Sequence, residues 1–310
     1  ALPSGQVAAL DETGARRPIV SVPAPPTRLA AAGGAVVVGM ADGRVWCLAD
    51  GEPQWEFACP AYRGQGSVTA VLASGDESAP LRATIGTAGG LVMGLDARGD
   101  PIWARDLGLS SVRGLVALPS PIGGLLLCWS AEGVWALAPA SGRAVWTEPA
   151  DDRPLCGVSV VPGGSDWWQA IVADAGGRIR ALGPPQERQS VSAGVAWEAN
   201  AGGVTTGVVP VVSGRQARLA VAATSGWLVR LELDGAEVGR TRLGSAIVGL
   251  APVSGGRVLT LSADGVVHLV GWGGEVVGRT ELGRRWSGCC VAGGRVFGLG
   301  PEGLACLEPV

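Results

Sequence analysis

The residue types that carry most enzyme chemistry are scarce in this chain. His268, in the run VVHLV, is the single histidine, and all 24 basic residues are arginine, so lysine is absent. A Ser-His-Asp triad or a histidine-based zinc site needs partners that the chain lacks, and Schiff-base chemistry needs a lysine amine. No glycine-rich phosphate motif opens a helix, because the sequence has no helical periodicity. We therefore expect no catalytic residues and no enzyme, and we expect His268 to pack between structural repeats.

The seven cysteines and one pair of aspartates are the remaining candidates for chemistry. The cysteines show no CxxC spacing, and four of them lie inside expected strands, as buried thiols do: Cys47, Cys128, Cys156 and Cys306. The vicinal pair Cys289 and Cys290 lies in the apolar run WSGCCVAG. Two small buried thiols are expected there, and the sequence leaves their thiol or disulfide state open. Asp151 and Asp152 are expected to form a solvated turn, and no metal site is predicted.

The composition indicates many short strands joined by tight turns. Of 310 residues, 47% are hydrophobic and 16% are charged, with 51 glycines and 21 prolines. A net charge of −3 with scattered arginines provides no basic surface of the kind that binds nucleic acid. No apolar run reaches the roughly 18 residues that span a bilayer, and the start ALPSGQ does not resemble a signal peptide. The buried thiols favour a cytoplasmic location, with export after removal of a signal as the alternative.

The expected strands belong to a unit that recurs along the chain. Its best copy is GRVWCLADGEPQW, residues 43–55, which predicts a strand, an Asp50-Gly51 turn and a second strand that carries Trp55. The glycine turn before this hairpin recurs, and successive glycines lie 38 to 49 residues apart, the spacing of propeller blades. Two further strands precede each hairpin, so each repeat predicts four strands, here called first to fourth.

Tryptophan recurs at one place on the fourth strand, at Trp55, Trp103, Trp146 and Trp197. The next two repeats carry glycine there, Gly239 and Gly278, inside the near-duplicate runs EVGRTRLG (237–244) and EVVGRTELG (275–283). A tryptophan buries about 150–250 Å². We therefore expect the recurring tryptophan to pack one repeat against the next.

The strand count predicts a single all-β domain, residues 1–310, folded as a seven-bladed β-propeller of four-stranded antiparallel blades. First and second strands pair seven times, and third and fourth strands pair seven times only if residues 5–20 supply one pair. This N-terminal hairpin would complete the last blade and close the ring between the chain ends, which leaves no open sheet edge. A strand at 304–309 competes with residues 7–10 for the third place, and the sequence leaves that choice open. Eight blades are the alternative.

The run G-x-V-x-x-L-x-x-x-G-x-x-x-W resembles the PQQ-like repeat family of β-propellers. The best copies are GRVWCLADGEPQW, GLVMGLDARGDPIW and GVWALAPASGRAVW, and weaker copies extend over nearly the whole chain. The resemblance implies the fold and leaves the function open, since members include quinone-dependent dehydrogenases, an outer-membrane assembly lipoprotein and domains of multidomain bacterial proteins. The enzymes hold calcium and the quinone with a Glu/Asn/Asp group on the axis. Because Asn200 is the only asparagine and no such group is visible, we expect a non-enzymatic member without a cofactor.

The loops from a fourth strand to the next first strand share one rim of a propeller with the second-to-third turns, and binding usually occurs there. These loops carry residue types that are enriched at interface hot spots: Tyr62, Arg63, Gln65, Arg153, Arg284, Arg285 and Trp286. An ordinary exposed surface is the alternative interpretation of the same loops.

We expect a non-catalytic scaffold that presents this rim to a protein or peptide partner, alone or as a module of a larger bacterial protein. The alternative function is a small-molecule or quinone-type site on the propeller axis, in a sensor or an oxidoreductase. Nucleic acid and a membrane span are not expected. The sequence specifies neither the partner nor the oligomeric state.

Overall fold

The computed structural model describes residues 6–10, 16–61, 66–74, 81–108, 110–118, 124–162, 168–183, 193–213, 216–283, 288–292, 295–300 and 303–307. Every regular element in these ranges is a β-strand, which confirms the all-β prediction, and none of the described residues forms a helix that could cross a membrane. The chain divides into two compact units. Unit 1 holds residues 1–11, 15–151 and 187–192, and unit 2 holds residues 12–14, 152–186 and 193–310.

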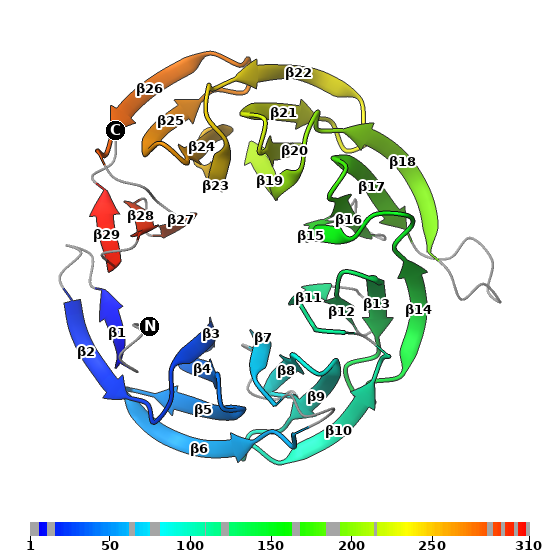
Figure 1. Cartoon of the computed structure of the whole chain (residues 1–310), viewed down its shortest axis with the longest axis vertical. Helices are drawn as coiled ribbons and strands as arrows, with labels where there is room; N and C mark the ends of the chain where they lie inside the picture. The colour runs from blue at the N-terminus through cyan, green and yellow to red at the C-terminus, as the bar shows by residue number, and fades with distance from the viewer. Residues whose placement is uncertain are drawn as a thin grey trace. The chain divides into compact units, whose positions relative to one another are not determined.

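Unit 1 contains a hairpin and three four-stranded antiparallel sheets (Figure 1). The hairpin pairs β1 (Gln6–Leu10) with β2 (Arg16–Ser21). The sheets follow in chain order, four strands to a sheet: β3 (Pro26–Ala32), β4 (Ala35–Met40), β5 (Arg44–Ala49), β6 (Glu52–Ala58), β7 (Val68–Ala73), β8 (Ala83–Thr87), β9 (Leu91–Leu95), β10 (Pro101–Asp106), β11 (Gly114–Leu118), β12 (Leu125–Trp129), β13 (Gly133–Leu137) and β14 (Ala144–Pro149).

Unit 2 contains three further four-stranded sheets and a final sheet with three described strands. The strands are β15 (Leu155–Pro162), β16 (Trp168–Asp174), β17 (Arg178–Gly183), β18 (Gly194–Asn200), β19 (Thr205–Ser213), β20 (Gln216–Ala223), β21 (Trp227–Leu231), β22 (Glu237–Arg242), β23 (Ile247–Val253), β24 (Arg257–Ser262), β25 (Val266–Val270), β26 (Val276–Glu281), β27 (Gly288–Ala292), β28 (Arg295–Gly300) and β29 (Gly303–Leu307). The predicted four-stranded repeat is therefore confirmed in six sheets.

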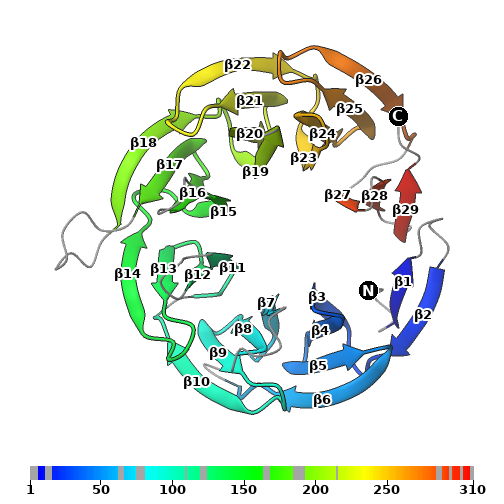
Figure 2. The ribbon, with the colours of Figure 1, turned by 180° about the vertical axis from the view of Figure 1, so that it is seen from behind.

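The first strands of successive sheets contact one another within each unit. In unit 1, β7 lies between β3 and β11; in unit 2, β15, β19, β23 and β27 follow one another (Figure 2). The fourth strands lie at the opposite margin of the sheets. Apolar side chains fill the space between the faces of successive sheets, as where Val37 and Val45 of one sheet meet Ile85 and Met93 of the next.

The tight turns depend on glycine and on one aspartate. Asp50 and Gly51 both have positive φ, 50° and 83°, which is the backbone of a hairpin turn that matches strand twist. Gly43 has φ 89°, and a Cβ there would lie 2.8 Å from the carbonyl oxygen of Gly66. Both the backbone angle and the available space therefore exclude a side chain at Gly43.

The recurring tryptophans pack one sheet against the next, as predicted. A Cβ on Gly99, in the following third-to-fourth turn, would lie 2.8 Å from the ring of Trp55. Trp103 covers Gly142 in the same way, and its indole nitrogen donates to the carbonyl of Pro139 at 2.7 Å. Glycine in these turns provides the flat surface on which the indole lies.

Each complete sheet carries a β-bulge in its fourth strand, which the sequence analysis did not predict. The pairing skips one exposed residue there: Gln54, Ile102, Val145, Ala196, Val238 and Val277. A bulge twists an edge strand and interrupts its row of free backbone groups. The outer strands are thus protected against pairing with other chains.

The chain ends form two incomplete sheets. β29 pairs with β28 and takes the third place, so the strand left over in the sequence count belongs to the last sheet. Hairpin β1–β2 pairs with no other described strand, and its Val7 and Val20 pack on Val38 and Met40 of the first sheet. Completion of the last blade by residues 5–20 stays a prediction.

Candidate functional site

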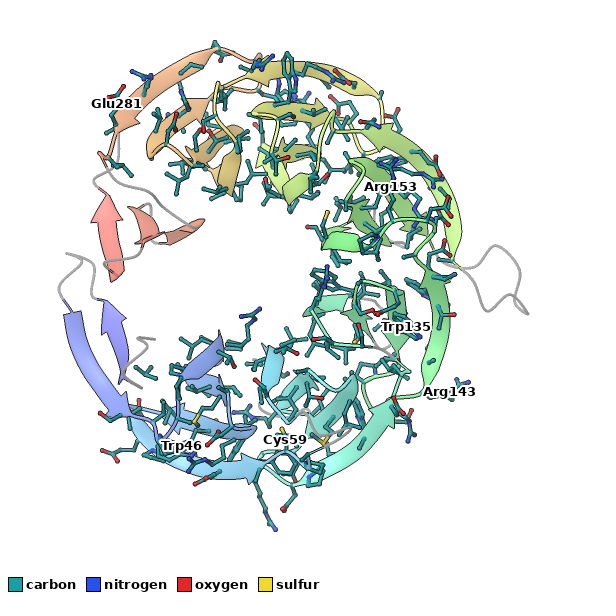
Figure 3. All side chains as sticks on the ribbon, in the orientation of Figure 1. Trp46, Cys59, Trp135, Arg143, Arg153 and Glu281 are labelled. Carbon is teal, nitrogen blue, oxygen red and sulfur yellow. The ribbon has the colours of Figure 1, made fainter. Side chains whose placement is uncertain are left out.

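Arg153 is the single predicted rim residue that the structure describes. It is exposed in the loop before β15, and its guanidinium occupies the space that a Cβ on Gly176 would need (Figure 3). Gly176 belongs to the second-to-third turn between β16 and β17, so this loop and this turn meet on one margin of unit 2. The other predicted rim residues lie outside the described ranges: Tyr62, Arg63, Gln65, Arg284, Arg285 and Trp286.

His268 is buried, as predicted, with 7% of its surface exposed. By alternation it shares a sheet face with Val270, which packs on Ala220 and Leu228 of the preceding sheet. Burial lowers the pKa of His268, Arg279 lowers it further, and Asp264 opposes both. A neutral, enclosed imidazole of this kind is a packing residue.

Burial disfavours the thiolate at three of the described cysteines, Cys47, Cys59 and Cys128. The thiol of Cys156 donates to the carbonyl of Ala173 at 3.4 Å. Cys47 and Cys128 are buried, and Cys59 and Cys156 are half-buried. Burial raises the pKa of Cys59 and of Cys128 to about 12, so neither forms a thiolate at neutral pH. Cys289 and Cys290 lie on β27, in the part of that strand whose side chains are not described.

Among the described residues, no group of three or more His, Cys, Asp or Glu side chains is placed to hold a metal ion. Asp151 and Asp152 are exposed in the loop before β15, which agrees with the predicted solvated turn.

A group at the same margin as Arg153 was missed by the sequence analysis. Trp227 is half-buried at the start of β21, directly after the turn at Gly226, and pairs in register with Arg242 of β22. The guanidinium carbons of Arg242 and Arg240 lie 5.7 and 5.9 Å from the centre of the indole. We call Trp227, Arg240 and Arg242 the Trp227 cluster.

The fourth-to-first loop between β18 and β19 borders this cluster. A Cβ on Gly202 of that loop would lie 3.3 Å from Nη1 of Arg240 and 3.7 Å from Cδ1 of Trp227. Glycine therefore lets the loop approach the indole, which also packs against the buried cluster that includes Val229 and Leu231. The cluster is formed by two strands and one loop that meet at the rim.

The cluster carries one positive charge that no described carboxylate neutralises. Arg240 donates to Glu237, with Nε 2.8 Å from Oε1, and this hydrogen bond lowers the pKa of Glu237 and raises that of Arg240. Arg242 is exposed, and its described contact is with the indole. A guanidinium over an indole face is a favourable arrangement that leaves the N–H groups of the cation available.

Sequence comparison finds a family match for the N-terminal half of the chain. Residues 3–154 match the family described as "Outer membrane protein assembly factor BamB". This segment belongs to the PQQ-like repeat family of β-propellers. No curated protein sequence matches the chain significantly.

Solved structures share the propeller fold of this chain. The computationally designed Ika8 protein aligns with a TM-score of 0.77 at 17% identity, over 98% of this chain and 90% of that chain. BamB from Moraxella catarrhalis aligns with a TM-score of 0.56 at 19% identity, over 90% and 92%. BBS1N, solved in complex with ARL6DN, aligns with a TM-score of 0.63 at 12% identity, over 98% and 97%. At these identities the similarity shows the fold alone.

Two repeated runs in unit 2 also contain the signal by which the cluster could have been found. The near-duplicate runs EVGRTRLG and EVVGRTELG differ in charge at one matched position, which holds Arg242 in the first and Glu281 in the second. The third-strand partners of these residues differ too, being Trp227 and Val266. These pairs are recognised as matched only once the strand register is known.

Proposed function

We propose that this chain is a non-catalytic scaffold that binds a protein or peptide through the rim of fourth-to-first loops and second-to-third turns. The Trp227 cluster carries this proposal, because it places a half-buried tryptophan beside exposed arginines at that rim. These two residue types are concentrated in the energetic centres of protein interfaces. Two proteins of similar fold support it: BBS1N was solved in complex with ARL6DN, and BamB is named as an assembly factor.

The alternative, a small-molecule or quinone-type site on the axis, finds less support in the residues. First strands line the axis of a propeller, and such a site needs several carboxylates or amides there. None of the seven described first strands contains Asp, Glu, Asn or Gln: β3, β7, β11, β15, β19, β23 and β27. Protein binding without catalysis is therefore the function that we propose.

We also propose that the sheets form one seven-bladed ring closed at the chain ends. The packing of Val7 and Val20 on the first sheet supports this, since Val45 and Phe57 of β5 and β6 pack on the second sheet in the same way. An experimental structure with eight separate blades would contradict it. The cytoplasm is the proposed location, and the free thiols of Cys47, Cys59 and Cys128 are in keeping with a reducing compartment.

Native mass spectrometry of the protein purified from its own host tests the scaffold function. We expect a complex with another polypeptide that Arg153→Glu weakens at least tenfold, because a rim charge is reversed. Arg143→Glu is the matched control, since Arg143 is also exposed but lies in a third-to-fourth turn and projects away from its sheet (Figure 3). A small bound adduct of a few hundred daltons without any polypeptide would contradict the proposal.

A further inference from the structure

The last two complete sheets of unit 2 offer an internal comparison of the cluster. Trp227 pairs with Arg242 in one sheet, and Val266 pairs with Glu281 at the same place in the next. In the second sheet Nη2 of Arg279 donates to Oε1 of Glu281 at 2.5 Å, so the charges cancel within the strand. At this place, the sheet β23–β26 carries an ion pair between Arg279 and Glu281. The sheet β19–β22 instead carries Arg242 without a described carboxylate partner, beside the indole of Trp227.

Two other third strands begin with an arginine that a fourth-strand glutamate faces. Arg44 lies 3.8 Å from Glu56, and Arg178 forms an ion pair with Glu198. At the matched place in β21 the arginine is replaced by Trp227, and the matched glutamate by Arg240. The fold of the repeat thus does not require an aromatic side chain or an extra cation at this position.

We infer that the Trp227 cluster binds an acidic segment of the protein partner, with a carboxylate on Arg242 and an adjacent apolar side chain against Trp227. This inference rests on the proposed scaffold function. A guanidinium offers two parallel N–H groups that match the two oxygens of a carboxylate. The half-buried indole holds the guanidinium over its face and adds an apolar contact beside it.

The charge of the whole chain favours a peptide over a nucleic acid as the ligand. Binding to nucleic acid relies on many phosphate contacts and a broad basic surface. This chain has a net charge of −3, and its described arginines are largely paired with carboxylates or carbonyl oxygens. A single available cation beside one indole suits one or two acidic side chains of a peptide.

Fluorescence anisotropy with a fluorescein-labelled peptide, Glu-Glu-Phe-Glu-Glu, tests the inference at low ionic strength. The double substitution Trp227→Val with Arg242→Glu copies the neighbouring sheet, which folds with these residues. We expect saturable binding by the unaltered protein and at least a tenfold loss of affinity in the double variant. Arg242→Lys keeps the charge but not the paired N–H geometry, and we expect it to weaken binding about threefold. Arg143→Glu is expected to bind normally.

Several outcomes would overturn the inference. One is absence of peptide binding by the unaltered protein, and another is equal binding by the double variant. Preference for a five-nucleotide single-stranded DNA over the peptide would assign the cluster to nucleic acid instead. If the natural partner co-purifies with the double variant but not with Arg153→Glu, the scaffold function stands and this inference alone fails.

Discussion

Different side chains fill the gap between sheets at two neighbouring interfaces in unit 2. We call the residue that fills each gap the seal. Between the sheets β15–β18 and β19–β22, Trp197 of the fourth strand lies on Gly235 and donates from its indole nitrogen to the carbonyl of Leu233 at 2.6 Å. Its register partner on the third strand is Ala181. A large side chain opposite a small one fills the gap up to the next turn.

The following interface has the reverse arrangement. The fourth strand carries Gly239, and Arg230 of the third strand, its register partner, fills the space instead. The guanidinium of Arg230 donates to the carbonyl of Trp272 and lies against Gly274 of the next turn. At this interface an arginine of the third strand thus fills the gap that a tryptophan of the fourth strand fills at the preceding interface.

The same size rule holds in all six complete sheets. The third-strand residue is small where the fourth strand carries tryptophan and large where it carries glycine: Cys47–Trp55, Gly94–Trp103, Ala136–Trp146, Ala181–Trp197, Arg230–Gly239 and Leu269–Gly278. The volume between two sheets is therefore the constraint, and either strand can fill it. The arginine seal differs in enclosing a charge, since burial lowers the pKa of Arg230 while Glu275 and Glu237 oppose this.

The largest expected effect is at the tryptophan seal. Trp197→Ala removes the indole from the interface and leaves the carbonyl of Leu233 without its donor, so we expect about 3 kcal/mol of lost stability. Urea unfolding measures this. Trp227→Ala is the control, because that indole is also half-buried in unit 2 but has no described hydrogen bond, and we expect it to cost about 1 kcal/mol. Equal losses would show that Trp197 is not the seal.

The arginine seal gives a smaller effect that a second substitution should reverse. Arg230→Ala empties the gap and costs about 2 kcal/mol. Gly239→Trp alone is expected to destabilise, since a Cβ there would already lie 2.9 Å from Nη2 of Arg230. Together the two substitutions recreate the Ala–Trp pair of the preceding sheet. We expect a favourable coupling of about 1–2 kcal/mol in this double-mutant cycle, and simple additivity would contradict the size rule.

The strands, the turns and the tryptophan seal follow from local sequence. Alternating apolar residues and glycine turns specify the hairpins, and Trp55 and Trp103 recur at a spacing that placed them at interfaces. Arg230 was not recognised as a seal, because its role depends on being paired with Gly239, which only the strand register reveals. The fourth-strand bulges were missed for the same reason.

The chain ends and the Trp227 cluster show where local pattern stops being informative. QVAAL in β1 and GLACL in β29 both read as third strands, so the sequence left the third place of the last sheet open, and pairing with β28 assigns it to β29. The predicted rim was chosen by loop composition. The cluster instead combines a strand start, a strand end and a glycine loop, and no single stretch contains it.

The smallest expected effect is a pH dependence of the folding stability that arises at only one of the two interfaces. His268 lies at the arginine-sealed interface, where burial lowers its pKa below the ordinary value of about 6.5. The unfolded chain then binds the proton more tightly, so stability is full above about pH 6.5 and declines as the pH falls below it. His268→Met, which copies Met93 at the matched place in β9, should lose this decline. Chemical unfolding between pH 5 and 7 measures the difference, and because the chain has one histidine, parallel curves for the two proteins would show that the imidazole titrates equally in both states.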